Sequence, residues 1–233
     1  MRKKTILGLI MVTTLMGTLV ACGAKDGKET GSITIENTRE VGENEKTNGL
    51  TGEWASKEFT YESFKEEGNK LSDKIQALSS DFGLQCKEDE KVKEIDGIVA
   101  NIKSISADNL DPEENKLESM QFSTEFLGKS QEGGRFKLKM SLKFDGEKAI
   151  QDENFNLGDT SLAKYIATIT GDENRDYSNI NEKIMEVIKS DKPESVVEDE
   201  VYGLHEEIAI SKEYIVYTLE TKEYKFVKEE SGI

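Results

Sequence analysis

The sequence predicts an α+β domain in which a mainly antiparallel sheet of hairpins packs against about three helices. Two periodicities predict this class. Apolar residues alternate strictly with polar ones along 136–144, the pattern of a strand with one buried face. Along 60–79 they recur at intervals of three and four, the pattern of a helix with one apolar stripe. The two kinds of segment are grouped along the chain, and this absence of regular βαβ alternation favours α+β over α/β.

Each expected helix has an apolar stripe and a residue that can cap its start. The caps are Thr60 for the first helix, Asp159 or Thr160 for the second, and Ser178 or Asn179 for the third. The stripes are Tyr61, Phe64, Gly68, Leu71, Ile75 and Leu78; Leu162, Tyr165, Ile166 and Ile169; and Ile180, Ile184, Val187 and Ile188. Gly171 is expected to end the second helix, and Asn179 with Glu182 has the spacing of a capping box.

Strands are expected first over 82–106, where Asp96-Gly97 inside a run rich in Val and Ile indicates a hairpin. A second hairpin is expected to join 120–126 to 136–144, with Gly133-Gly134 as its turn.

Two further regions also read as strands. Asp145-Gly146 predicts a tight turn into a strand over 148–157. The segment 202–226 has the alternation of a three-strand antiparallel meander.

The first residues of the chain have the composition of an export signal. Arg2, Lys3 and Lys4 precede an apolar run of about sixteen residues, shorter than the roughly twenty that a membrane-spanning helix needs. The run ends in Leu19-Val20-Ala21-Cys22, which resembles the lipobox of bacterial lipoproteins. The resemblance implies cleavage after Ala21 and attachment of diacylglycerol to the Cys22 sulfur.

This resemblance sets the expected domain organisation. Residues 1–21 form the signal peptide, 22–52 the lipidated N-terminus with a flexible tether, and 53–233 a single α+β domain. Two acyl chains bury enough CH2 groups, at about 0.8 kcal/mol each, for stable anchoring. The expected location is therefore the extracytoplasmic face of the cell membrane, with the membrane contacted through the lipid on Cys22.

The net charge and the cysteine count of the chain limit the binding partners and covalent links that we expect. The chain carries 31 Lys and Arg against 47 Asp and Glu, a formal net charge of −16. Nucleic-acid binding is not expected, because phosphate affinity depends on clustered cations. Once Cys22 is lipidated only Cys86 remains, so no intramolecular disulfide is expected.

Two catalytic or metal motifs are present in part. Ser161-Leu162-Ala163-Lys164 fits S-x-x-K, but the accompanying motifs of serine-acylating enzymes are missing, and a helix start explains it. Asp172-x-Asn174-x-Asp176 matches the first half of an EF-hand loop. Its sixth and twelfth positions are Tyr177 and Lys183 instead of Gly and Glu, so a helix connection is predicted instead of a calcium site.

His205 is the one histidine of the chain, so a zinc site would need carboxylates for most of its ligands. We expect His205 to face solvent from a strand and Cys86 to be a buried small apolar residue. A nucleophilic pair of Cys86 and His205 is the alternative. The sequence therefore predicts no catalytic, metal or cofactor-binding residue, and Cys22 is the one site assigned.

The expected function is that of a non-enzymatic binding or accessory module at the cell surface. One alternative is a small hydrolase that uses dispersed carboxylates. Another is a protein inhibitor or stress-related lipoprotein. A hydrolase should bring two carboxylates together with raised pKa values, whereas an inhibitor should expose a rigid loop or a strand edge.

Overall fold

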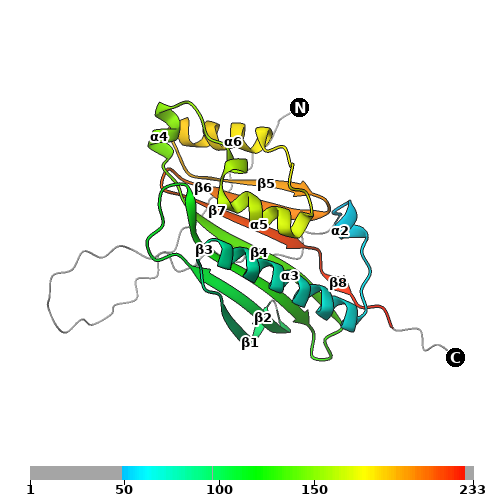
Figure 1. Ribbon diagram of the computed structural model, residues 1–233. Coiled ribbons are helices and arrows are strands. Elements are labelled where there is room, and N and C mark those ends of the chain that lie inside the picture. The colour runs from blue at the N-terminus through cyan, green and yellow to red at the C-terminus, as the bar shows by residue number, and fades with distance from the viewer. Residues whose placement is uncertain (1–48, 96, 229–233) are drawn as a thin grey trace, which may run out of the picture. The chain divides into compact units, whose positions relative to one another are not determined.

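The computed structural model describes residues 49–95 and 97–228, which contain an α+β fold built on one antiparallel sheet (Figure 1). The predicted signal, Cys22 and the tether up to residue 48 lie outside the described residues. The strands follow the order β1-β2-β3-β4-β7-β6-β5, and β8 pairs with β4. Their bounds are β1 Lys87–Ile95, β2 Ile98–Asp108, β3 Lys116–Leu127, β4 Gly133–Lys143, β5 Ser195–Val201, β6 Leu204–Ile210, β7 Tyr214–Thr221 and β8 Tyr224–Lys225.

The three long helices pack on the same face of this sheet (Figure 1). The helices are α2 Glu53–Ser56, α3 Tyr61–Asp81, α4 Gly146–Gln151, η2 Leu157–Asp159, α5 Ser161–Thr170 and α6 Ser178–Lys189. One hydrophobic cluster fills the space between the sheet and these helices. We call the opposite side of the sheet its outer face. The predicted fold class is thus confirmed, with three long helices on a sheet of hairpins.

Helix α3 confirms the first predicted helix. Thr60 is its N-cap, and Thr60 and Ser63 form a reciprocal capping box. Gly68 on the apolar stripe allows close approach to β3, because a Cβ there would lie 2.6 Å from the Thr124 hydroxyl oxygen. Phe64 stacks on Phe136 of β4 with their ring centroids 4.2 Å apart.

Both predicted N-terminal hairpins are present, but the second turns elsewhere than expected. Strands β1 and β2 flank Asp96-Gly97 as predicted, and Gly97 has a φ of 80°. Gly133 and Gly134 are instead the first residues of β4, paired with Leu127 and Phe126. The turn lies in the preceding residues, 128–132. Gly134 is required for packing, since a Cβ there would lie 2.6 Å from the Phe64 ring.

The predicted strand over 148–157 is wrong. Residues 146–151 form helix α4, which Asp145 starts by accepting a hydrogen bond from the Lys148 amide at 2.9 Å. The Asp-Gly pair is therefore a helix start and not a hairpin turn. Two-residue turns and helix N-caps favour the same residue types, so the dipeptide by itself does not separate them.

Helices α5 and α6 confirm the remaining two helix predictions, although their caps differ in detail. Gly171 ends α5 in the left-handed conformation, with a φ of 77°. Asn179 lies inside α6 and not at its cap, so the predicted capping box with Glu182 is wrong. Asp176 instead accepts a hydrogen bond from the Ser178 amide at 2.8 Å.

The predicted three-strand meander over 202–226 is correct for β6 and β7, but β8 pairs with β4 and not with β7. The C-terminal part of the sheet also contains a strand that the sequence did not indicate. Strand β5 precedes the predicted ones and forms the edge of the sheet. Tyr202 lies in the β5–β6 turn with Gly203, with φ angles of 53° and 80°. A pair of positive φ angles is typical of a type I′ hairpin. The run Glu198-Asp199-Glu200 hides the alternation of β5, because charged residues occupy both faces of an edge strand.

Candidate functional site

The outer face of the sheet carries polar side chains in its centre. In β4, Arg135, Lys137 and Lys139 alternate with residues of the hydrophobic cluster. The Arg135 guanidinium lies 2.7 Å from Glu125 of β3 and 2.9 Å from Glu220 of β7. All three side chains are buried, so these ion pairs fix the relative positions of three adjacent strands.

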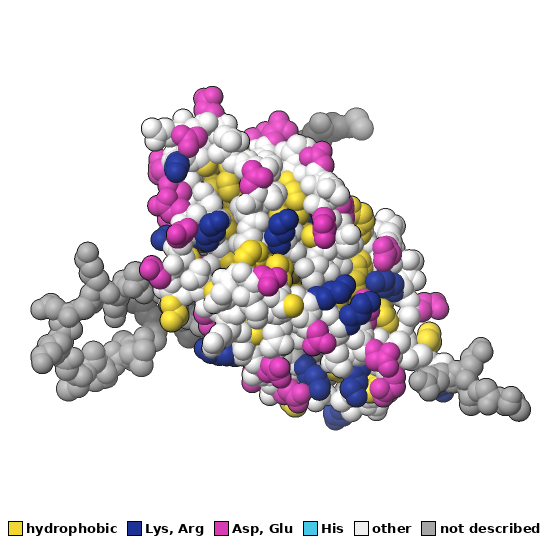
Figure 2. Space-filling view, viewed as in Figure 1, with side chains coloured by type: hydrophobic (Ala, Val, Ile, Leu, Met, Phe, Trp, Pro, Cys, Tyr) yellow, Lys and Arg dark blue, Asp and Glu magenta, His cyan; other side chains and the backbone are white. Residues whose placement is uncertain are grey.

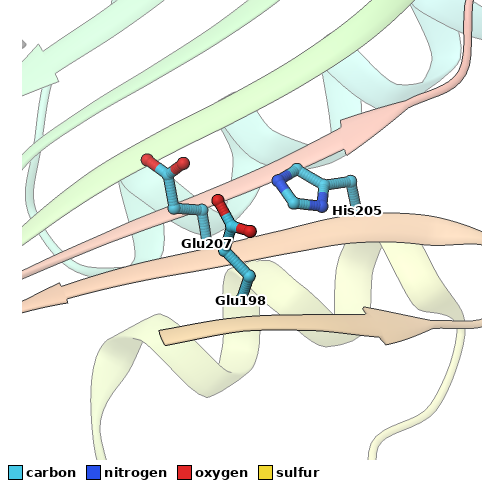
Figure 3. Close-up of side chains that lie close together, drawn as sticks. All are labelled: Glu198, His205 and Glu207. Carbon is cyan, nitrogen blue, oxygen red and sulfur yellow. The ribbon is translucent and has the colours of Figure 1, made fainter. Parts of the chain in front are cut away.

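The acidic part of the outer face lies over β5 and β6 and contains a three-residue cluster, Glu198, His205 and Glu207 (Figure 3). His205 and Glu207 are two residues apart in β6 and so share a face, and Glu198 of β5 is paired with Glu207. One ligand atom from each side chain lies within 4.8 Å of the other two. The Glu198 carboxylate lies between the Glu207 carboxylate and the imidazole (Figure 3).

The position of His205 confirms one part of the prediction and contradicts another. His205 faces away from the helices, as its phase relative to Leu204 and Ile208 indicates. It is nevertheless buried, with 8% of its surface exposed, and so it does not face solvent. Glu198 was missed because it belongs to the unpredicted strand β5. Recognising Tyr202-Gly203 as a type I′ turn would have placed β5, and with it Glu198, beside β6.

A second charged group lies on the helix side of the same strands. Arg175, from the connection between α5 and α6, donates to both carboxylate oxygens of Glu206 at 2.7 and 2.9 Å. It also donates to the Tyr217 hydroxyl at 3.0 Å, and Tyr217 in turn hydrogen-bonds Glu206. Burial lowers the pKa of the Arg175 guanidinium, but the bonds and charge of Glu206 outweigh it and raise that pKa above its ordinary value. This group anchors the α5–α6 connection to the sheet.

The incomplete EF-hand motif lies in this connection, and hydrogen bonds within the protein engage its carboxylates. Tyr202 and the Asn174 amide donate to Asp172, and both bonds lower the pKa of that carboxyl group. The Ser178 amide likewise lowers the pKa of Asp176. Lowered pKa values are opposite to what a general acid needs, so these residues act as loop and helix caps.

The other candidate nucleophiles, Ser161 and Cys86, also take part in the hydrogen bonding and packing of the fold. Ser161 accepts a hydrogen bond from the Leu117 amide at 3.1 Å, while Lys164 of the same motif is exposed. Cys86 is half-buried and packs against the hydrophobic cluster, near Tyr165. His205 lies on the other side of the sheet, so the structure does not bring Cys86 and His205 together as a nucleophilic pair.

The helix side of the molecule shows Asp and Glu interspersed with Lys and Arg (Figure 2). A shallow depression lies beside α4, and its lining includes Asp145, Glu147, Lys148 and Ile150. Charged groups of both signs make it unlike the apolar pockets that bind small ligands. The cluster on the outer face is therefore the stronger candidate site.

No protein-family model, curated protein or solved structure matches this chain.

Proposed function

We propose that this protein is an extracytoplasmic lipoprotein whose domain is a non-enzymatic binding module held at the membrane by Cys22. The observation that carries the proposal is the Leu19-Val20-Ala21-Cys22 segment at the end of an apolar run. Its position at the end of a short apolar run after three cations is the position that lipid attachment requires. Among the described residues, no helix has the length and apolar character that crossing a membrane requires.

The chemistry of the domain supports binding over catalysis. Ser161 and the carboxylates of Asp172 and Asp176 are engaged in hydrogen bonds that shape loops and helix ends. The Glu198–His205–Glu207 cluster is a group of side chains from adjacent strands that converge on one point. Such a convergence on a rigid sheet suits the holding of a ligand.

The anchoring is tested by replacing Cys22. The Cys22→Ala chain is expected to lose metabolic labelling by radioactive palmitate and to accumulate as uncleaved precursor or leave the membrane fraction. Cys86→Ala is the matched control and should be labelled like the unaltered chain. Palmitate labelling that persists in Cys22→Ala, or is lost in Cys86→Ala, would contradict the proposal.

A small hydrolase is the second candidate, because Glu198 and Glu207 bring two carboxylates beside an imidazole. Hydrolysis of ester, phosphate or glycoside reporter substrates that disappears in Glu207→Gln would favour it. Equal background rates for the two chains favour the binding module.

A further inference from the structure

The side chains of Glu198, His205 and Glu207 form a donor set that the local strand geometry brings together. Their strands are hydrogen-bonded neighbours, with Glu198 paired to Glu207 and Glu200 paired to His205. All these residues are therefore on the outer face. The backbone fixes their relative positions, so the set exists without rearrangement of the chain.

The chemistry of the donors points to one class of ligand. One imidazole nitrogen and two carboxylates suit a transition-metal dication such as Zn²⁺, whereas Ca²⁺ and Mg²⁺ prefer oxygen donors alone. The buried imidazole is what distinguishes this set from the many acidic pairs on the surface of so acidic a chain. Three protein ligands leave a fourth tetrahedral position for water or for a group from a partner.

The distances are compatible with such an ion after small side-chain movements. Metal bonds of about 2.0–2.1 Å place tetrahedral ligand atoms about 3.3 Å apart. The present ligand atoms lie within 4.8 Å of one another, so each pair has to approach by no more than about 1.5 Å. Glu198 is exposed and Glu207 half-buried, so rotations of their carboxylates can close this distance while His205 stays in place.

The local charge acts in the same direction. Two carboxylates held this close repel each other, and a dication between them converts that repulsion into attraction. In the sheet, His205 is also flanked by Glu200 of β5, whereas Glu220 on its other side forms ion pairs with Arg135 and Lys137. The carboxylates of β5 and β6 thus make this end of the outer face acidic, which concentrates cations around the site.

We propose that Glu198, His205 and Glu207 together bind one divalent transition-metal ion, with an open fourth position. The inference names a ligand for the proposed binding module. It rests on the proposed function only where it treats the bound metal as the ligand of that module. The metal itself, or a partner group that completes its coordination, is the species that the anchored domain holds.

Because the chain has one histidine, its imidazole resonances report on this site directly. The full chain is prepared in detergent without a polyhistidine tag, and Zn²⁺ is titrated in competition with a chromophoric chelator. We expect one bound Zn²⁺ per chain and a shift of the His205 imidazole resonances that saturates at that ratio. Absence of saturable binding, or unshifted His205 resonances at saturation, overturns the proposal.

Three variants and one control separate the site from general acidity. Glu198→Gln, His205→Gln and Glu207→Gln should each weaken Zn²⁺ binding by at least about tenfold. Glu94→Gln, at an exposed position on edge strand β1 of the same sheet, should bind like the unaltered chain. Equal affinity in all four variants contradicts the assignment.

Folding is controlled by circular dichroism, and Glu198→Gln carries the test if His205→Gln fails to fold, because Glu198 is exposed. At one Zn²⁺ concentration that saturates the unaltered chain, the rise in the midpoint of thermal unfolding should be larger for the unaltered chain than for Glu198→Gln. An equal rise in both overturns the proposal. Binding is measured in the Cys22→Ala chain as well. Palmitate labelling that persists in this chain, with Zn²⁺ binding retained, would refute the anchor while leaving the metal site standing.

Discussion

Replacing Arg175 with Met removes the bidentate partner of Glu206, whose residue surface is 0% exposed. Breaking a buried ion pair by removing one partner typically costs about 3–5 kcal/mol, because the other charge stays buried without compensation. The Tyr217 hydroxyl continues to hydrogen-bond Glu206, so we expect a loss near the lower limit, about 3 kcal/mol. For a domain of this size, that loss lowers the unfolding midpoint by about 6–12 °C.

Urea unfolding measures this cost, and the single tryptophan of the chain, the buried Trp54, is the fluorescence probe. The double variant Arg175→Met with Glu206→Leu removes both charges and should recover most of the lost stability. Lys183→Met is the matched control. It breaks the half-exposed Lys183–Asp199 pair and should cost less than about 1 kcal/mol. A loss below about 1 kcal/mol for Arg175→Met, or a double variant no more stable than the single one, would refute the reasoning.

Three further predictions concern a cap, a close contact and a phenol. Asp145→Ala removes the hydrogen bond to the Lys148 amide and should cost about 1 kcal/mol in urea unfolding; an unchanged stability would mean that α4 does not depend on this cap. Gly134→Ala places a Cβ against the Phe64 ring and the Glu125 carbonyl oxygen and should cost about 1–3 kcal/mol in the same assay, whereas an unaffected variant would show that β4 does not need glycine here. Burial raises the pKa of Tyr177 from 10.0 to about 12. The contribution of its neutral phenol to the free energy of unfolding is therefore fully present below pH 10 and is lost as the pH rises to about 12. Unfolding measured at about pH 9 and pH 11 should show an alkaline loss that Tyr177→Phe reduces, and an equal loss in both proteins would contradict that pKa.

The helices were predictable because local periodicity and packing agree in them. The stripe of α3 and its Thr60 cap lie within one segment of chain, so the sequence contains both its start and its buried face. Strand β4 was predictable for the same reason, because its apolar residues all face the helices. Where a local signal has two physical meanings, prediction failed. Asp145-Gly146 starts α4 instead of a hairpin, and Gly133-Gly134 lies in a strand where Phe64 needs the space.

The candidate site was less accessible to prediction, because its residues come from two strands. The phase of β6 indicated that His205 lies opposite the helices, which the structure confirms. Glu198 lies in β5, whose edge position allows charges on both faces and so removes the alternation that identifies a strand. A ligand set assembled across a strand pair depends on register, and register follows from the Tyr202-Gly203 turn.

The sequence by itself determined the α+β class and the three long helices, because each depends on residues that are neighbours along the chain. Only the tertiary structure decided that Arg175 reaches a buried Glu206 and that Glu198 meets His205 and Glu207. These contacts depend on pairing between strands and on the path of a loop over the sheet. The energy of such contacts is gained only after distant segments meet, so no local pattern records them.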